Sequence, residues 1–274
     1  MTESRKISRF WSVAAAALIV FAIAPVLIVF SVSLRPQTPM LLARDFLPPA
    51  RPSLVSYRDV LSEPGFLRAT LNSAFVTLLC IGGNIGLGSL AAWALTRQRG
   101  IPFRATMFTL VFAIALPQQA TVVPLFLLFQ RWSLLDTFTG IVLPGLIMPV
   151  NVLVLFQGMR RIPQSLLNAA MLDGASAAYC FRRVVLPLVA PSVGVVTINT
   201  FMASWSAFLL PFLLTTTAEH RTLPVALALL KTQDDVRWSL VIAGAALTAL
   251  PVVLLFALAH RKIVSGLTAG GIKG

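Results

Sequence analysis

The sequence predicts an all-α polytopic membrane protein with six transmembrane helices and a cytoplasmic helix between spans four and five. Of its 274 residues, 57% are hydrophobic and only 11% are charged, whereas a soluble domain carries roughly 25% charged residues. The apolar residues form six long runs separated by polar connections. Because no long soluble block remains between these runs, residues 1–274 are expected to form a single transmembrane domain with short tails at 1–10 and 261–274.

The first two runs differ in what surrounds them. Trp11–Phe30 contains 20 residues without a charge, enough to cross about 30 Å of hydrocarbon. A secretory signal has a shorter apolar region of roughly 7–15 residues, so we interpret this run as a retained first span. Leu34–Arg68 is a polar, proline-rich connection. The second span, Asn72–Leu95, carries four clustered glycines, which let membrane helices pack closely.

Prolines interrupt the middle spans. The remaining four spans are expected at Ala105–Gln130, Thr137–Phe156, about Leu188–Leu214 and about Trp238–Ala259. Span three is broken by Pro117 and Pro124, and span four contains Pro144 and Pro149. A membrane helix tolerates proline where neighbours or water satisfy the freed carbonyl groups. These prolines fit helices that bend around a pathway, and they fit simple packing kinks equally well.

Basic residues are distributed unevenly between the two sides of the membrane. With the N-terminus inside, 13 of the 22 Lys and Arg residues lie on the cytoplasmic side, with only Glu3 and Asp173 as acidic residues. The outer segments hold nine basic and seven acidic residues. This positive-inside pattern predicts that both termini and the loop between spans four and five are cytoplasmic. The net charge of +13 is therefore a topology signal, and no nucleic-acid partner is expected, since that would need a basic soluble block.

The spans carry no chemistry that could drive transport or catalysis. No Asp, Glu, Lys, Arg or His falls in the interior of any span, whereas ion-coupled transporters usually keep ionisable groups there. His220 and His260 are expected on opposite sides of the membrane, so they cannot share a metal. We expect no catalytic residue, metal or cofactor on this chain. It also lacks a Gly-x4-Gly-Lys-Ser/Thr phosphate-binding loop, so the energy source is expected on another subunit.

Besides a pore that is driven by another subunit, two classes of protein remain compatible with these observations. An ion-coupled secondary transporter could build sodium sites from backbone carbonyl groups alone. A non-transporting membrane scaffold would need no coupling chemistry. The loop between spans four and five bears on this choice, because a pore without its own energy source needs a place where a partner docks.

That loop predicts a short helix with a surface of small residues. Pro163 can sit in a first helical turn, Gln164–Ala170 are good helix formers, and Gly174 can end the helix in a left-handed conformation. The surface of this segment carries little side-chain bulk, so another backbone could approach it closely. The small residues are Ala169, Ala170, Gly174, Ala175 and Ala177. The alternative interpretation is a plain amphipathic loop helix with a glycine cap.

The same loop resembles the cytoplasmic loop of the membrane subunits of ATP-binding-cassette importers. That family's pattern is Glu-Ala-Ala, three residues, Gly, and about nine residues later a hydrophobic-x-Leu-Pro. Here Asn168 replaces the Glu; an Asn accepts hydrogen bonds but cannot make the charge-assisted contact of a carboxylate. The resemblance implies that the following residues couple the spans to a partner ATPase: Asn168, Ala169, Ala170, Asp173, Gly174, Ala175, Leu186 and Pro187.

The C-terminus narrows the resemblance to one class of subunit. Ile263–Gly274 is similar to the ending of one of the two permeases of carbohydrate-uptake importers, the maltose/glycerol-phosphate-like second permease, and the family core would cover about 68–260. By composition alone this tail is a glycine-rich, flexible end. The resemblance implies that it reaches towards the ATPase, which singles out Gly266, Thr268 and Lys273.

The resemblance also implies partners, a location and a solute. The chain would pair with a second permease subunit in the lipid bilayer of the bacterial inner (plasma) membrane. Two ATPase subunits would bind ATP and Mg, and an extracytoplasmic binding protein would deliver the solute. A sugar or sugar-like solute is implied, of the oligosaccharide, amino sugar or glycerol-phosphate type.

Span five offers polar and aromatic groups that could line a sugar path. The residues proposed for this path are Asn199, Ser204, Trp205 and Ser206. Interhelical hydrogen bonding combined with an interfacial Trp is the alternative interpretation of the same residues.

Overall fold

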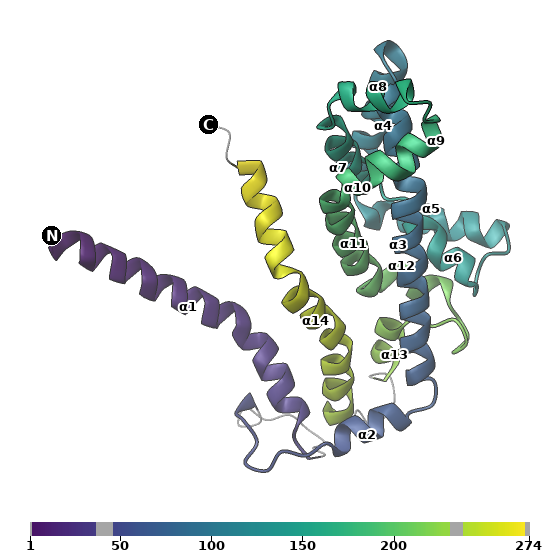
Figure 1. Cartoon of the computed structure of the whole chain (residues 1–274). Helices are drawn as coiled ribbons and strands as arrows, with labels where there is room; N and C mark the ends of the chain where they lie inside the picture. The colour runs from purple at the N-terminus through teal and green to yellow at the C-terminus, as the bar shows by residue number, and fades with distance from the viewer. Residues whose placement is uncertain (1, 37–45, 231–237, 272–274) are drawn as a thin grey trace. The chain divides into compact units, whose positions relative to one another are not determined.

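The structure is a computed structural model that describes residues 2–36, 46–230 and 238–271. Every regular element within these ranges is a helix (Figure 1). Three helices, α1, α3 and α14, are individually long and apolar enough to cross a membrane. Three bent helix pairs raise the number of candidate spans to six if each pair is one span. The prediction of an all-α polytopic membrane protein is confirmed.

The chain divides into two compact units. Unit 1 comprises Met1–Leu67 and Leu227–Pro251, and unit 2 comprises Arg68–Ala226 and Val252–Gly274. Unit 1 contains α1 (Thr2–Ser33), α2 (Val55–Ser62) and the first part of α14 (Trp238–Gly271). The other helices, of which α3 and α13 cross the boundary between the units, are α3 (Phe66–Arg97), α4 (Gly100–Ala115), α5 (Gln118–Arg131), α6 (Phe138–Val142), η2 (Leu143–Gly145), α7 (Pro149–Arg160), α8 (Gln164–Leu172), α9 (Ala177–Tyr179), η3 (Cys180–Val185), α10 (Leu186–Leu188), α11 (Ala190–Trp205), α12 (Leu209–Leu214) and α13 (Leu223–Leu229).

In unit 1, α1 presents its apolar side chains outward. In the most apolar part of Trp11–Ser33, no residue is buried within the protein. Phe21, for example, is 80% exposed. Such a helix suits a hydrocarbon environment, where apolar side chains need no protein cover. By contrast, α14 packs closely in this unit, because a Cβ at Gly244 would lie 2.8 Å from the Leu227 side chain.

Three of the predicted spans are bent in the structure. The break measures 100° between α4 and α5, 43° between the α6–η2 segment and α7, and 76° between the α9–α10 segment and α11. At the first break, Leu116 and Pro117 are both extended, with ψ of 123° and 127°. Proline lacks an N–H and pushes the preceding residue out of the helical region. The expected break at Pro117 is therefore present, but the break expected at Pro124 is wrong, since α5 continues through it.

Span five is shorter than the sequence predicted. Instead of one helix over Leu188–Leu214, α11 ends at Trp205 and a separate helix, α12, begins at Leu209. Pro211 explains the interruption, because it could not donate an N–H to the turn before it. As the third residue of α12 it lies in a first turn, where no intrahelical N–H bond is needed.

One apolar cluster joins the loop helix to the spans of unit 2. Leu167 of α8, Phe181 of η3, Leu155 of α7 and Leu95 of α3 are all at most 8% exposed and belong to it. Figure 1 shows α8 and α9 at one end of this unit, beside the end of α3. A side chain packed this fully resists displacement, since a core residue typically touches 6–12 others. The loop helix is therefore attached to the helices beneath it.

Candidate functional site

The helix α8 begins and ends through backbone signals. Pro163 has a ψ of 131° and lies just before the helix as its N-cap residue, so the expectation that it forms part of the first turn is wrong by one position. At the other end, the Ala175 N–H donates to the Ala170 carbonyl and the Gly174 N–H to that of Met171. This pair of bonds is a Schellman motif, which needs a left-handed residue. Gly174 supplies it with a φ of +87°.

One face of α8 is anchored and the other is exposed. Leu167 is 5% exposed, whereas Leu172 is 89% exposed, and Leu166 and Met171 are also exposed. An apolar side chain as exposed as Leu172 on a loop helix marks a contact surface when several lie together. The predicted coupling residues follow the same division: Asn168, Ala169, Asp173 and Gly174 are exposed, and Ala170 and Ala175 are half-buried.

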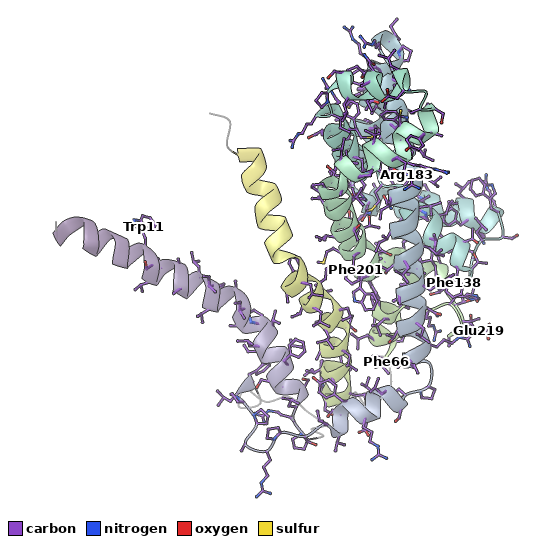
Figure 2. The ribbon with its side chains drawn as sticks, in the orientation of Figure 1. Trp11, Phe66, Phe138, Arg183, Phe201 and Glu219 are labelled. Carbon is purple, nitrogen blue, oxygen red and sulfur yellow. The ribbon has the colours of Figure 1, made fainter. Side chains whose placement is uncertain are left out.

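The segment after α8 attaches the loop to α3. Phe181 of the π-helical turn η3 lies 6.0 Å from the Trp93 ring, and the Arg97 guanidinium stacks 4.2 Å from the same ring. Stacking of this kind holds an arginine by cation–π attraction. On α10, Leu186 is half-buried and Pro187 is exposed. Arg182 and Arg183 project outward at this end of the unit, where Figure 2 marks Arg183.

A buried polar network crosses the middle of unit 2. Asn84 is fully buried and makes four hydrogen bonds. Its Nδ2 donates to the carbonyls of Cys80 (2.9 Å) and Gly145 (2.7 Å), and its Oδ1 accepts from the Met148 N–H (2.8 Å) and the Asn151 Nδ2 (2.9 Å). The bonds to Gly145 and Met148 satisfy backbone groups freed by the bend between η2 and α7. Unpaired groups of this kind are costly in a membrane.

Asn151 extends this network to α11. Its Nδ2 donates to the Thr200 Oγ1 at 2.9 Å, and its Oδ1 accepts from the Asn199 Nδ2 at 2.8 Å. Of these residues, Asn199 was predicted from the sequence, whereas Asn84 and Asn151 were not. Both are strongly polar side chains within apolar runs, which was the signal available, because such groups in a membrane span need a partner.

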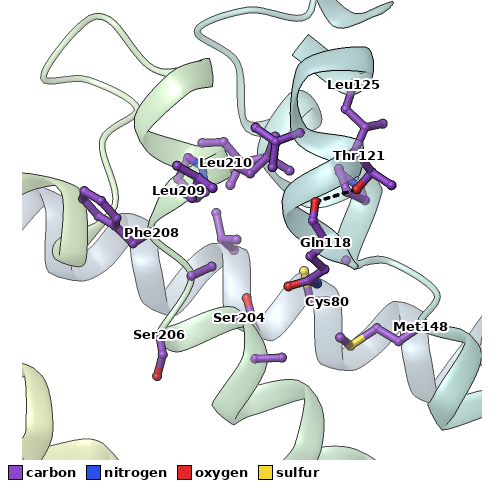
Figure 3. A pocket seen from close by; sticks show the side chains of 18 of the residues that line it. Cys80, Gln118, Thr121, Leu125, Met148, Ser204, Ser206, Phe208, Leu209 and Leu210 are labelled. Atoms are coloured by element: carbon purple, nitrogen blue, oxygen red, sulfur yellow. Dashed lines mark hydrogen bonds between the residues drawn. The ribbon is translucent and has the colours of Figure 1, made fainter. Parts of the chain in front are cut away.

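Beside this network lies a cavity of about 690 Å³. Figure 3 shows side chains from several helices directed into it, with Gln118 and Ser204 facing the same space. The wall combines hydroxyl and amide groups with apolar side chains. Its lining residues are Val76, Cys80, Ala113, Leu116, Gln118, Gln119, Thr121, Val122, Leu125, Ile141, Pro144, Gly145, Met148, Thr200, Ala203, Ser204, Ser206, Ala207, Phe208, Leu209, Leu210, Pro211 and Thr222.

The structure separates the four residues proposed for the solute path. Ser204 and Ser206 line the cavity. Asn199 is held by Asn151 and does not line it. Trp205 is 6% exposed and stacks on Phe201 with ring centroids 5.6 Å apart. The aromatic ring that does line the cavity is Phe208.

A carboxylate organises two connections of unit 2, the one between α5 and α6 and the one between α12 and α13. Asp136 accepts hydrogen bonds from the N–H groups of Thr216 and Thr217 and from the Thr217 hydroxyl (2.7 Å). Burial by itself raises the pKa of Asp136. The bonds from Thr217 and Thr216 and the nearby His220, 3.6 Å away, outweigh burial and hold this pKa below its ordinary value. Figure 2 marks Glu219 in the same connection.

The remaining candidates concern metals and the C-terminal tail. Among the residues that the structure covers, no group of three or more His, Cys, Asp or Glu side chains could hold a metal ion. Gly266 and Thr268 lie on α14, whose backbone is helical to Gly271 where composition predicted a flexible end. Lys273 lies outside the described residues.

Comparison with known proteins identifies the family. Residues 84–263, about two thirds of the chain, match the family described as "Binding-protein-dependent transport system inner membrane component". The chain belongs to this family. The resemblance of the loop to this family is therefore confirmed. As the inner membrane component, the chain is non-catalytic, and ATP hydrolysis belongs to a separate subunit of such a system.

Relatives of this inner membrane component are permeases of sugar transport systems. It is 32% identical to the sulfoquinovosyl glycerol transport system permease SmoH of Agrobacterium fabrum, over 96% of this chain and 93% of the relative. It is 31% identical to the trehalose transport system permease SugB of Mycobacterium tuberculosis, over 97% of each chain. It is 28% identical to the diacetylchitobiose uptake permease DasC of Streptomyces coelicolor, over 97% of this chain and 98% of the relative.

Solved structures support the fold of this inner membrane component. A chain of a bacterial ABC transporter that imports the acidic polysaccharide alginate superposes with a TM-score of 0.83 at 22% identity, covering 95% of this chain and 98% of that one. A second structure holds the alginate transporter with its pentasaccharide-bound periplasmic protein, with a TM-score of 0.64 at 16% identity, covering 94% of this chain and 96% of that one. At such identities the likeness concerns the fold.

Proposed function

We propose that the chain is one of two permease subunits of an ATP-driven importer for a sugar or sugar-like solute, and that α8 is its coupling helix. The observation that carries this proposal is the two-sided character of α8. Leu167 fixes it to the spans, and Leu172 stands exposed beside a glycine cap. Family membership and the sugar-permease relatives support the solute class.

The partners we propose are those of a binding-protein-dependent transport system. Two ATPase subunits bind ATP and Mg, a second permease completes the pathway, and a binding protein delivers the solute from outside. The residues proposed to meet an ATPase are Asn168, Ala169, Ala170, Asp173, Gly174, Ala175, Leu186 and Pro187, with Gly266, Thr268 and Lys273 of the tail as further contacts. We further propose that the two compact units act together as a single transmembrane domain, 1–274, with a family core of about 68–260.

Coupling works through the apolar cluster beneath α8. When the ATPases close on ATP, they move α8, and Leu167 passes that displacement to α3, α7 and α11 through the cluster. Rigid tilting of packed helices switches a cavity between its two openings. The ATPases shift this equilibrium only as far as they bind the two states with different affinity. The exposed Leu172 surface contributes to that difference.

The orientation in the membrane rests on the charged residues near α8. Arg97, Arg160, Arg161, Arg182 and Arg183 all lie in or beside the segments at this end of unit 2. Positive charge near span ends favours the cytoplasmic side. Both termini are then cytoplasmic, as is α8, and the Asp136 connection lies outside.

The test exchanges one exposed leucine for alanine. Leu172→Ala removes the apolar contact without touching the buried cluster, and we expect ATPase co-purification in mild detergent to fall at least fivefold, since interface anchors typically contribute more than about 1 kcal/mol. ATP-dependent sugar uptake in proteoliposomes falls with it. Leu54→Ala is the matched control, because Leu54 is 68% exposed near α2, and it leaves both measurements unchanged.

Other outcomes would point to a different function. If the wild-type chain co-purifies without an ATPase and takes up solute on an ion gradient alone, the importer proposal is wrong and the protein is a secondary transporter. If no solute moves with any recovered partner, it is a scaffold. Normal coupling in Leu172→Ala would contradict the role of α8 while leaving the importer assignment intact.

A further inference from the structure

The wall of the 690 Å³ cavity carries no charged side chain. Its lining residues include none of the types Asp, Glu, Lys, Arg or His within the described part of the chain. The polar groups there are amides and hydroxyls, namely those of Gln118, Gln119, Thr121, Thr200, Ser204, Ser206 and Thr222. Such a wall is polar without an electrostatic preference for either sign of ion.

One of these groups is left without a bond. Thr222 is 4% exposed and lines the cavity, and its Oγ1 has no hydrogen-bond partner among the described residues. A buried hydroxyl without a partner is unfavourable, and each such group in a native protein calls for an explanation. A bound molecule with hydroxyl groups would satisfy it once the neighbouring atoms that cover the Oγ1 move aside.

We propose that this cavity is a solute site for an uncharged, hydroxyl-rich molecule, and that the importer selects neutral over acidic saccharides. The inference rests on the proposed importer function and adds the site and the charge of its substrate. Its volume lies within the range of about 300–1,000 Å³ typical of small-molecule sites.

The side chains match the two surfaces of a sugar. Amides and hydroxyls both donate and accept, as the hydroxyl groups of a saccharide do, so Gln118, Ser204 and Thr222 can pair with them in either sense. Phe208 and Ile141 supply apolar surface for the C–H face of a ring. Figure 3 shows Phe208 and Leu209 on one side of the cavity and Gln118 on the other.

An acidic saccharide would find no partner on this wall. Ionised groups that leave water need an opposite charge or several hydrogen bonds, and carboxylates are usually met by Arg or Lys. The first turn of α5, which contains Gln118 and Gln119, contributes only the partial positive charge of a helix N-terminus. That attracts hydroxyl oxygens but does not replace a formal cation.

The experiment uses the complete transporter, with its co-purified partners, in proteoliposomes. Uptake is measured for two uncharged saccharides, trehalose and diacetylchitobiose, and for two acidic solutes, sulfoquinovosyl glycerol and an alginate oligosaccharide. We expect uptake of an uncharged member at least tenfold more efficient than that of either acidic one. Comparable or better uptake of an acidic solute overturns the inference, as does ATP-dependent activity with no uptake of either uncharged member.

Hydroxyl-removing variants locate the site. Ser204→Ala and Thr222→Val each raise the half-saturating concentration for the transported saccharide about 3- to 10-fold, as expected for one lost hydrogen bond. Thr197→Val is the matched control, because the Thr197 hydroxyl on α11 donates to the Val193 carbonyl and does not line the cavity. If all three variants behave alike, the cavity is not the site.

Failure of the importer function would look different. In that case no ATPase co-purifies and uptake does not depend on ATP for any solute. Failure of the inference alone leaves ATPase association and ATP-dependent uptake in place, with either the wrong charge preference or no effect of the two hydroxyl variants.

Discussion

Two asparagines of unit 2 show how the same side chain serves opposite purposes. Asn84 is fully buried and joins α3 to the bend between η2 and α7 through four hydrogen bonds. Asn168 is exposed on α8 and accepts one bond, at 3.1 Å, from Gln164 of the same helix. The first makes contacts that this chain needs to fold. The second is exposed on the helix where we propose that a partner binds.

The difference in burial between these two asparagines indicates where effects on stability and effects on function can be separated. A buried polar group must be satisfied within the chain, since an unpaired one carries its full desolvation penalty. An exposed polar group that has no protein partner lowers the stability little, because water forms hydrogen bonds with it. Substitutions are therefore expected to lower stability in proportion to burial, whereas the effects at α8 appear in coupling.

The strongest test of this comparison is Asn84→Leu. The substitution leaves the Gly145 carbonyl and the Met148 N–H without their partner, whereas the Asn151 amide keeps its bonds to Thr200 and Asn199. At about 1–3 kcal/mol for each unpaired group, we expect a loss of stability on the order of 3 kcal/mol, measured by thermal unfolding in detergent.

Leu90→Ala is the control for that experiment. Leu90 lies on the same helix, is 50% exposed, and should change the unfolding temperature little. Equal stability of the two variants would show that the network contributes nothing. That result would contradict the conclusion that the buried asparagine matters more for stability than the exposed one.

A smaller effect is expected where two helices approach closely. A Cβ at Gly158 of α7 would collide with the Ser192 side chain of α11. Overpacking typically costs about 1–3 kcal/mol, part of which the better helix propensity of Ala offsets, so Gly158→Ala lowers stability by about 1–2 kcal/mol. Adding Ser192→Gly should restore the wild-type unfolding temperature. No recovery would exclude the steric cause.

In burial, Asp136 lies between the buried Asn84 and the exposed Asn168: it is half-buried in the connection between α5 and α6. Its folded pKa lies below the ordinary value of 3.8, so its stabilising contribution is complete above that value. It is lost as the pH falls from 3.8 through the lower folded pKa. Asp136→Asn should cost about 1 kcal/mol at neutral pH and flatten the acid side of the stability curve. An unchanged acid profile would show that the bonds to Thr216 and Thr217 do not depend on the charge.

The smallest effect on stability is expected at the exposed Asn168. Asn168→Glu restores the carboxylate of the family pattern and should change thermal stability by less than about 0.5 kcal/mol. An exposed ion pair with an ATPase would contribute about 0.2–1 kcal/mol, which is at most about a fivefold gain in affinity, measured by titration of the purified ATPase. A tenfold loss instead would mean that the amide makes a specific contact.

The features that the sequence predicted correctly depend on neighbouring residues. The apolar runs, the loop helix and its glycine cap are each specified within a few residues, as the φ of Gly174 shows. The Asn84–Asn151–Thr200 contacts join residues 49 to 67 positions apart in the sequence, and no local pattern specifies them. Their partners are set by how three helices pack.

The lining of the cavity was hard to predict for a related reason. Because α11 is apolar around most of its surface, the sequence could not indicate which side faces the cavity, and Ser204 could not be told apart from Asn199. The two prolines of span three were equally ambiguous. Pro117 breaks the helix and Pro124 does not, although both lack the same N–H, so their surroundings decide the outcome.

The 100° break between α4 and α5 has a consequence for biogenesis. With 16 and 14 residues, the two helices are roughly 24 Å and 21 Å long at 1.5 Å per residue, and neither matches the hydrocarbon thickness of about 30 Å. During synthesis, the first of them therefore emerges without being a complete membrane crossing. We therefore expect insertion of this region to require the second helix and the protein neighbours that shelter the extended backbone at Leu116, so that topology and tertiary packing are acquired together.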